Sequence, residues 1–526
     1  MAIAKIELES GLKDAHEITQ EETVQETEID VTHAQPTRKL ERFISFFPIF
    51  GFACTVLGSW EGVAAGFGAG LLNGGPVVLV YGYILATIGA MCMSCSIAEM
   101  ASIVCVSGGQ YHWTAKYAPA ASNFWGLMQG WLTVFGWLAS VSALPYFAGT
   151  QIEGLIALNY LGYQPQRWHG TLLIWATMIV PVLINMFARK LLAPFETLGI
   201  IMHLSFLPIF IVVLVVLAPH SSPSFVFTDF IGDQSGWTNK GVIFSIGLLT
   251  STYTFTGFDG PLHMGEEVKN ARTVVPQTMV LAVLTNGIMA LGWMICLLFT
   301  IGNVQNALTT RTGYPIIEIF YQATHSLHGT NTLMAMLMLT GYVSLTNSLA
   351  SVSRLTWAFA RDNGLPFSAF FAYVSPKYKI PLRALGLIVV VVFLLSFIQL
   401  GSTVAFQGII SLSTLALYAS YTLPILFFTV HKLRGRPINY GPWKMGRYGV
   451  LVNFFAIAWG VYSCCFLPFP PMLPVANPAE LNWSGPVFGF VILLALLDWF
   501  LRGRRKHFTL DRVLEEEEVS GSGDGR

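Results

Sequence analysis

Charged side chains are scarce in this sequence of 526 residues, in which only 11% are Asp, Glu, Lys or Arg. A soluble domain carries about 25% of these residues. Apolar and aromatic residues reach 54% instead. The shortage of charge excludes a soluble enzyme or a soluble binding domain and indicates a chain that lies largely within a lipid bilayer.

Other absences narrow the class further. Lys and Arg balance Asp and Glu at 29 each, so the net charge says nothing about nucleic acid, and no nucleic-acid partner is expected. The first apolar run begins only after residue 42, so no cleavable signal peptide is expected either. The seven cysteines show neither a metal-ligand spacing nor a disulfide framework, and no nucleophile–base pair stands out in the apolar runs. We therefore expect no metal, no cofactor and no enzyme activity.

The apolar residues gather into long runs that predict an all-α membrane protein of about twelve transmembrane helices, since roughly 20 residues of helix cross a hydrocarbon core. Residues 1–42 are predicted to be a disordered acidic tail, 43–501 the transmembrane domain and 502–526 a second tail. The predicted spans are Phe46–Gly70, Pro76–Met100, Ser122–Ala148, Trp168–Ala188, Phe195–Leu217, Gly241–Met264, Pro276–Ile301, Asn331–Trp357, Leu382–Leu400, Val404–Val430, Tyr448–Phe469 and Gly485–Leu501.

The distribution of Lys and Arg predicts the orientation, because cytoplasmic loops carry an excess of both. With both termini cytoplasmic, only Arg167, Lys240 and Arg311 fall on the outer side. An odd number of spans would destroy this alternation. We therefore expect a multi-pass protein, placed in the plasma membrane, with both termini inside.

Two of the spans combine glycine with an acid. Span one carries Gly58 and Gly62 around Glu61. A carboxylate deep in an apolar span costs roughly 2.5 kcal/mol or more unless it is paired, protonated or hydrated. Such glycines are also typical of close helix packing, and an acid at this place can cap a half-helix, so structural interpretations stay open.

Span six contains Gly257, Gly260 and Pro261 around Asp259. Proline removes a helical N–H and clashes with the preceding turn, so regular helix should break here. Interruptions at corresponding positions of two halves of a membrane chain indicate a transport site. The two breaks predict a five-plus-five inverted repeat with broken helices 1 and 6, although Asp259 can also be a helix cap.

The breaks have a chemical use in solute binding. Broken helices expose backbone N–H and C=O groups at mid-membrane, where they can replace the hydration shell of a small polar solute. Aromatic rings beside the breaks offer cation–π contacts to a cationic head, although ordinary packing explains each ring as well. These rings belong to Trp60, Tyr253, Phe255 and Phe258.

Several short motifs stand at the ends of the spans. They are Gly74-Gly75-Pro76, Ala98-Glu99-Met100-Ala101-Ser102, Ser107-Gly108-Gly109-Gln110-Tyr111-His112-Trp113, His263-Met264-Gly265-Glu266-Glu267 with Asn270-Ala271 and Val275-Pro276, and Ala360-Arg361-Asp362-Asn363-Gly364-Leu365-Pro366. In order and spacing they resemble the fungal amino acid/choline/GABA permeases of the amino acid–polyamine–organocation (APC) superfamily. Each motif alone is weakly specific, but the resemblance runs from about Arg42 to Arg502.

The resemblance implies alternating access in two inverted five-helix repeats plus two C-terminal helices, with the substrate between spans one and six. Spans three, eight and ten would complete the chamber. Amino-acid carriers often show a denser glycine run in span one, whereas here Ser59 and Trp60 follow the glycine, which favours the choline/GABA branch. At matching positions the predicted substrate-binding residues are Thr55, Gly58, Ser59, Trp60, Glu61, Thr254, Phe255, Thr256, Gly257, Phe258 and Asp259.

The coupling ion is predicted from the titratable groups. Related sodium carriers use small hydroxyls of spans one and eight, and span eight is rich in them, but Ser and Thr are also common at packed helix interfaces. Proton-driven relatives place a titratable group in span five, where this chain has His203. Histidine titrates closest to neutral pH, so His203 and Glu61 are the candidates for proton coupling, although a membrane histidine can also be a packed, hydrogen-bonded residue.

The function predicted from these features is secondary active transport of a small amine, amino acid or choline/GABA-like solute, by H⁺ symport. An exporter of a secondary metabolite and a nutrient sensor that does not transport remain alternatives. The charges Glu266, Glu267, Lys269 and Arg272 at the inner end of span six either form gate salt bridges or are solvated loop charges, and Arg361-Asp362 after span eight has the same two interpretations. Asn482, in Asn-Trp-Ser, is a glycosylation candidate on the predicted outer side. The oligomeric state does not follow from the sequence.

Overall fold

The computed structural model describes residues 40–187, 192–232, 235–401, 403–477 and 481–504. Positions 1–39 and 505–526 of the two predicted tails lie outside these ranges, so the tails stay predictions. Residues from Glu41 onward belong to one unit. In the described ranges the regular structure is helical, apart from two isolated backbone bridges, Ile44–Val268 and Gly74–Ile231.

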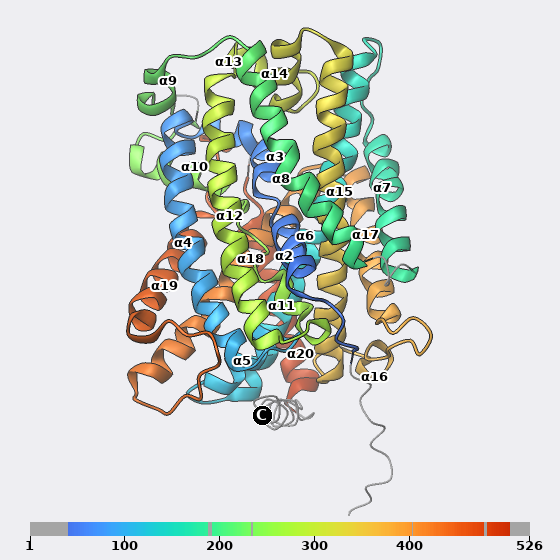
Figure 1. The fold of residues 1–526 in the computed structure, drawn as a ribbon, viewed down its shortest axis with the longest axis vertical. Coiled ribbons are helices and arrows are strands. Elements are labelled where there is room, and N and C mark those ends of the chain that lie inside the picture. The colour runs from blue at the N-terminus through green and yellow to red at the C-terminus, as the bar shows by residue number, and fades with distance from the viewer. Residues whose placement is uncertain (1–39, 188–191, 233–234, 402, 478–480, 505–526) are drawn as a thin grey trace, which may run out of the picture. The chain divides into compact units, whose positions relative to one another are not determined.

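Eleven helices of the described ranges are long and apolar enough to cross a membrane. The helices Lys240–Tyr253 and Gly260–His263 together supply a further crossing. This crossing is broken, so neither helix is long enough to qualify alone. The prediction of an all-α protein with about twelve spans is confirmed. The elements of the bundle (Figure 1) are α2 (Phe46–Leu57), α3 (Ser59–Leu72), α4 (Gly75–Ile103), α5 (Gly109–Tyr117), α6 (Ser122–Asn159), α7 (Arg167–Phe187), α8 (Leu192–Leu217), α9 (Pro223–Thr228), α10 (Lys240–Tyr253), α11 (Gly260–His263), η4 (Gly265–Glu267), α12 (Ala271–Phe299), α13 (Val304–Leu308), α14 (Pro315–Thr324), α15 (Leu327–Arg361), α16 (Ser368–Phe371), α17 (Leu382–Gly401), α18 (Thr403–Leu433), η5 (Gly446–Tyr448), α19 (Gly449–Phe466), α20 (Ser484–Asp498) and η7 (Trp499–Gly503).

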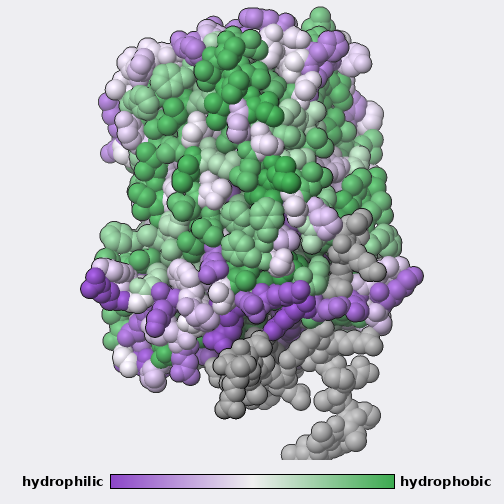
Figure 2. All heavy atoms as spheres, viewed as in Figure 1, coloured by the Kyte–Doolittle hydropathy of each residue, from purple (hydrophilic) through white to green (hydrophobic). Residues whose placement is uncertain are grey.

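Apolar side chains cover the lateral surface of these helices. Ile88, Val216 and Phe455 are 56%, 73% and 59% exposed, which is unfavourable in water and favourable against lipid chains. Figure 2 shows apolar residues over the middle of the visible face and strongly polar residues gathered toward one end. This distribution matches a bilayer-spanning domain.

Helices five spans apart pack against each other. α4 contacts α12, α6 contacts α15 and α7 contacts α17, which pairs spans two, three and four with spans seven, eight and nine. The half-helices of the two broken spans pair likewise, α2 with α11 and α3 with α10. Spans one to four thus each contact the span five places later, as expected of a five-plus-five repeat, and the predicted fold class is confirmed.

The two ends of the bundle are named here by the short helices that lie there. α5 and α16 lie at one end, the α5 end, and α9, α13 and α14 lie at the other, the α13 end (Figure 1). Arg311, between α13 and α14, donates from Nη1 and Nη2 to the carbonyls of Leu161 and Tyr160, each at 3.5 Å. The loop after α6 therefore belongs to the α13 end as well.

Candidate functional site

Span one breaks at Gly58, between α2 and α3. Gly58 has φ 48° and ψ 44°, a left-handed conformation that glycine adopts without a Cβ penalty. Its N–H donates to Cys54 O at 3.0 Å, and Gly62 N–H donates to Gly58 O at 2.8 Å. The break predicted from the glycines of this span is present.

Asn286 of α12 bonds the backbone on both sides of this break. Its Oδ1 accepts from Ser59 N–H at 3.0 Å, and its Nδ2 donates to Cys54 O at 3.2 Å and to Ala282 O at 3.1 Å. Asn286 is fully buried, so these bonds satisfy groups that have no access to water. The sequence analysis missed this residue, although a lone amide in an apolar run is a signal for such a role.

Span six is unwound from Thr254 to Asp259, between α10 and α11. Gly257 has φ 98°, which favours glycine, and its N–H donates to the Tyr421 hydroxyl at 3.2 Å. The freed carbonyl of Thr254 accepts from Ser59 Oγ at 2.6 Å. The two breaks thus bond directly to each other, and α18 bonds to the second.

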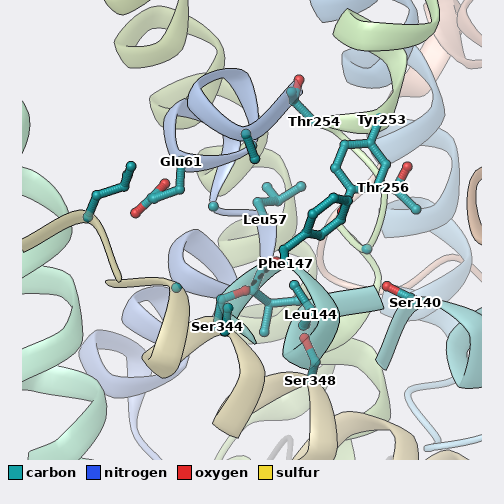
Figure 3. A pocket seen from close by; sticks show the side chains of 18 of the residues that line it. Leu57, Glu61, Ser140, Leu144, Phe147, Tyr253, Thr254, Thr256, Ser344 and Ser348 are labelled. Atoms are coloured by element: carbon teal, nitrogen blue, oxygen red, sulfur yellow. Dashed lines mark hydrogen bonds between the residues drawn. The ribbon is translucent and has the colours of Figure 1, made fainter. Parts of the chain in front are cut away.

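A cavity of about 100 Å³ lies between the two breaks and is called the chamber below. In Figure 3 the Glu61 carboxylate lies apart from the adjacent rings of Phe147 and Tyr253, with hydroxyl side chains around them. Spans one, three, six and eight supply its walls. The lining residues are Val56, Leu57, Gly58, Glu61, Gly62, Ala65, Trp137, Ser140, Leu144, Phe147, Ala148, Gln151, Tyr253, Thr254, Thr256, Gly257, Leu337, Met338, Gly341, Ser344 and Ser348.

The predicted binding residues divide into two groups in this structure. Those on the chamber wall are Gly58, Glu61, Thr254, Thr256 and Gly257. Those buried against neighbouring helices instead are Thr55, Ser59, Trp60, Phe255, Phe258 and Asp259. α6 contributes Trp137, Ser140 and Phe147, which the sequence analysis did not nominate singly.

Glu61 on the chamber wall contacts the buried side chain of His203. Glu61 Oε1 lies 2.9 Å from His203 Nδ1, and Trp60 Nε1 lies 3.2 Å from the same nitrogen. A ring nitrogen cannot donate to Glu61 and accept from Trp60 at once. Which contact forms depends on the ring tautomer: Nδ1–H donates to Glu61, whereas bare Nδ1 accepts from Trp60.

Glu61 Oε2 has no hydrogen-bond partner among the described residues, although it is shielded from bulk water. A Cβ on Gly58 would lie 3.6 Å from this oxygen. Glu61 makes no capping bond at the start of α3, since that cap uses no side chain. The carboxylate therefore presents one free acceptor atom beside the break.

Asp259 is buried and fully bonded. Its Oδ2 accepts from Gln110 Nε2 at 2.5 Å, Trp137 Nε1 at 3.1 Å and His263 Nε2 at 3.1 Å, and its Oδ1 accepts from Tyr421 at 2.6 Å. It makes no side-chain cap bond to α11. Asp259 therefore does not act as a helix cap. Its carboxylate joins α5, α6, α11 and α18 instead.

Both ring nitrogens of His263 face acceptors. Nδ1 lies 2.7 Å from Ser107 O, and Nε2 lies 3.1 Å from Asp259 Oδ2. Two acceptors require two N–H donors, so this geometry fits a protonated ring.

Ion pairs close the α5 end. Arg354 Nε donates to Glu267 Oε1 at 2.8 Å, with the two side chains 4% and 0% exposed. Arg361 Nη1 lies 3.0 and 2.9 Å from the two carboxylate oxygens of Glu266. Of the two interpretations left open above, salt bridges describe Glu266, Glu267 and Arg361. Lys269 is exposed, and Arg272 donates from Nε to Ser102 O at 3.0 Å.

Asp362 extends this cluster just beyond α15. It accepts from the Tyr111 hydroxyl at 2.6 Å and lies 3.3 Å from Arg361 Nε and 3.0 Å from His112 Nε2. Burial alone would raise the pKa of Asp362, but Arg361, His112 and the Tyr111 hydrogen bond together hold it below its usual value. Asp362 is therefore an ionised anchor of the closed end.

Span five carries a buried carboxylate, Glu196, that was not predicted from the sequence. Glu196 Oε2 accepts from Asn347 Nδ2 at 2.6 Å, and the same nitrogen donates to Thr55 Oγ1 at 2.8 Å. An acid one residue inside the predicted span was the available signal. Span-eight hydroxyls contact neighbouring backbone, as Ser351 does with Gly260 O at 2.7 Å.

Asn482 uses its side-chain amide inside the protein. Nδ2 donates to Leu467 O at 2.6 Å and to Phe469 O at 3.1 Å, and Oδ1 accepts from Ser484 N–H at 3.1 Å. A glycan on Nδ2 would displace these bonds. The glycosylation candidate stays a prediction, with this geometry against it.

A bundle of membrane-crossing helices with a chamber between two mid-membrane breaks defines a transmembrane transporter. A model of the amino acid permease family matches residues 44–495, and the chain belongs to this family. It is a transporter and not an enzyme.

Relatives of known name extend over nearly the whole chain. A choline transporter of Saccharomyces cerevisiae is 28% identical over 483 residues, which cover 91% of this chain and 84% of the relative. An amino-acid permease of Arabidopsis thaliana is 28% identical over 492 residues, covering 89% and 93%. An amino-acid permease of Neurospora crassa is 28% identical over 472 residues, covering 89% and 86%.

Proposed function

We propose that the chain carries a small cationic amine across the plasma membrane by proton-coupled symport with alternating access. The observation that supports this most is the Glu61 carboxylate on the chamber wall, with Oε2 unpaired and Oε1 at His203. An ammonium or quaternary ammonium head would lie at Oε2. The rings of Trp137, Phe147 and Tyr253 suit such a head by cation–π contact.

The chamber offers little to an anionic group. No Lys or Arg occurs among the described residues that line it. Two backbone donors of the breaks, Ser59 N–H and Gly257 N–H, are already bonded to Asn286 and Tyr421. An α-carboxylate would find neither a cation nor these N–H groups, so an amine or choline-like solute fits better than an α-amino acid.

The two oxygens of Glu61 allow proton and solute to bind together. A proton on His203 Nδ1 would be held by Oε1, while the solute head occupies Oε2. Both positive charges would then share one carboxylate, which favours symport over exchange. A proton on Glu61 itself would compete with the solute instead and would give exchange.

Access from the α13 end supports an outward-facing state. The chamber shares Ala65 and Phe147 with a second cavity at that end, while the ion pairs described above close the α5 end. We place the α5 end in the cytoplasm, because Lys379, Lys432 and Arg502 gather there whereas few basic residues lie at the α13 end.

Uptake of radiolabelled choline, 4-aminobutyrate, amino acids and polyamines into a permease-deficient fungal host tests the proposal. We expect saturable choline or amine uptake that a protonophore abolishes and whose KM falls as external pH falls. A KM that rises as pH falls would contradict symport and favour exchange. Net outward flux would favour the exporter, and signalling without flux the sensor.

Glu61→Gln tests the site itself. Losing a charge-assisted contact should lower uptake of a cationic solute by about 10–100-fold and flatten its pH dependence. Glu318→Gln is the matched control, since Glu318 lies in α14 outside the chamber wall and accepts from Gln322 at 3.0 Å. Equal uptake by the two variants would remove Glu61 from the mechanism.

A further inference from the structure

A second cavity, the vestibule, lies at the α13 end. It measures about 410 Å³ and is lined by α3, α6, the loop after α6 and the segment between α13 and α14. Its residues are Ala65, Tyr146, Phe147, Thr150, Glu153, Gly154, Ala157, Pro165, Arg311, Thr312, Gly313 and Tyr314. It meets the chamber at Ala65 and Phe147, so a solute entering the chamber from this end passes through it.

The vestibule carries one charge of each sign. Glu153 and Arg311 both line it, and among the described residues no salt bridge of 4.0 Å or less joins them. Arg311 is exposed, and within the described ranges its guanidinium hydrogen-bonds only to the carbonyls of Leu161 and Tyr160, both at 3.5 Å. Carbonyl contacts hold the guanidinium in place and leave its charge without a counter-ion.

Glu153 is held in a fixed orientation. Its Oε1 accepts from the Tyr163 hydroxyl at 3.1 Å. Burial raises the pKa of Tyr163 to about 12, with the Glu153 charge adding to the effect, so this hydroxyl stays a donor. His169 Nδ1 lies 2.7 Å from the same hydroxyl and 3.9 Å from Glu153 Oε1. Within the described residues, Glu153 Oε2 accepts no hydrogen bond.

We propose that the vestibule is a second solute site, which binds a small zwitterion with its ammonium at Glu153 and its carboxylate at Arg311. Charge-assisted bonds to a carboxylate and a guanidinium are the strong ones in proteins, and Arg suits planar carboxylates in particular. The chamber, with a single acid and no cation, lacks the second half of this pair. The vestibule therefore selects differently from the chamber, and this inference does not depend on transport of a cation.

Cysteine protection on purified protein in detergent tests the site without any transport. Pro165→Cys places a thiol at the exposed part of the wall, and Ala157→Cys places one deeper. The rate of their modification by a hydrophilic maleimide is measured with 4-aminobutyrate, n-butylamine or butyrate present. The unsubstituted chain gives the background from its own cysteines, of which Cys465 is exposed.

We expect 4-aminobutyrate to slow modification, and the two singly charged analogues to do so only at concentrations about tenfold higher or more. Glu153→Gln and Arg311→Gln should each raise the protecting concentration about tenfold. Glu61→Gln should leave protection unchanged, because Glu61 lies on the chamber wall and not on the vestibule wall.

Other outcomes overturn the proposal. Protection that survives both Glu153→Gln and Arg311→Gln, or that butylamine gives as well as 4-aminobutyrate, excludes a zwitterion site. If neither introduced cysteine reacts in the folded protein, the vestibule is closed to solutes and the proposal is wrong. If Glu61→Gln leaves uptake intact while protection follows Glu153 and Arg311, the chamber proposal fails and the vestibule site stands.

Discussion

Replacing Asn286 with Leu should destabilise the protein more than replacing another buried asparagine does. The leucine keeps the volume but removes the acceptor of Ser59 N–H and the donor to Cys54 O. Cys54 O still accepts from Gly58 N–H at 3.0 Å, so only Ser59 N–H is left without a partner. A buried polar group left without a partner costs about 1–3 kcal/mol and one lost hydrogen bond about 1 kcal/mol, so the sum is roughly 2–4 kcal/mol.

Thermal unfolding of the purified protein measures this cost. At about 2 °C per kcal/mol, the lower end for large domains, the Tm should fall by roughly 4–8 °C. Asn286→Asp keeps an acceptor for Ser59 N–H and loses the donor to Cys54 O. Its Tm should therefore lie between that of the unsubstituted protein and that of Asn286→Leu.

Asn185→Leu is the matched control. Asn185 is also buried in a spanning helix, and its Nδ2 donates to Pro181 O at 3.0 Å and Thr346 O at 2.9 Å. Thr346 lies within the regular helix α15, so its carbonyl retains a helical partner and the loss should be about 1 kcal/mol. If Asn286→Leu lowers the Tm no more than Asn185→Leu, then Asn286 does not hold the break and the reasoning is refuted.

Three further outcomes follow from the same contacts. Gly58→Ala places a side chain at φ 48° and should lower the free energy of unfolding by about 1–2 kcal/mol. Gly292→Ala, with open space around its Cβ, should leave it unchanged, and thermal unfolding measures both. Arg354→Gln leaves Glu267 buried without its partner and should cost about 3–5 kcal/mol, and adding Glu267→Gln should restore much of the Tm; no recovery would contradict the ion-pair account. Because the folded pKa of Asp362 is depressed, its stabilisation is present above about pH 4, its unfolded value, and is lost as pH falls through the folded value; Asp362→Asn should flatten this acid limb of stability, and an unchanged limb would exclude Asp362 as its source.

Features with a local cause were predictable from the sequence. The breaks at Gly58 and before Pro261 follow from glycine and proline, whose backbone limits act within a few residues. The spans follow from the length of their apolar runs. Span six was also predictable, although no single helix of that crossing reaches membrane length, because its glycines and hydroxyls continue an otherwise apolar run.

Side-chain direction around the breaks was not predictable. Successive residues of a helix point about 100° apart, and the left-handed residue at Gly58 resets that angle by an amount that composition does not encode. Trp60 therefore lies against His203, whereas Glu61 reaches the chamber wall. Asn286 and Glu196 were missed for a different reason: their partners, such as Ser59 and Asn347, lie more than 150 residues away in the chain.

The two acids that the sequence sets in parallel positions differ in what they can still bind. Asp259 accepts four side-chain hydrogen bonds, so a solute would have to displace a partner to reach it. Glu61 has one contact to His203 and one unpaired oxygen beside a glycine that leaves space for a ligand atom. Asp259 thus suits holding span six to its neighbours, and Glu61 suits binding. Removing the charge of Asp259 should lower the free energy of unfolding more than it alters solute preference. Removing the charge of Glu61 should alter solute preference more than it lowers the free energy of unfolding.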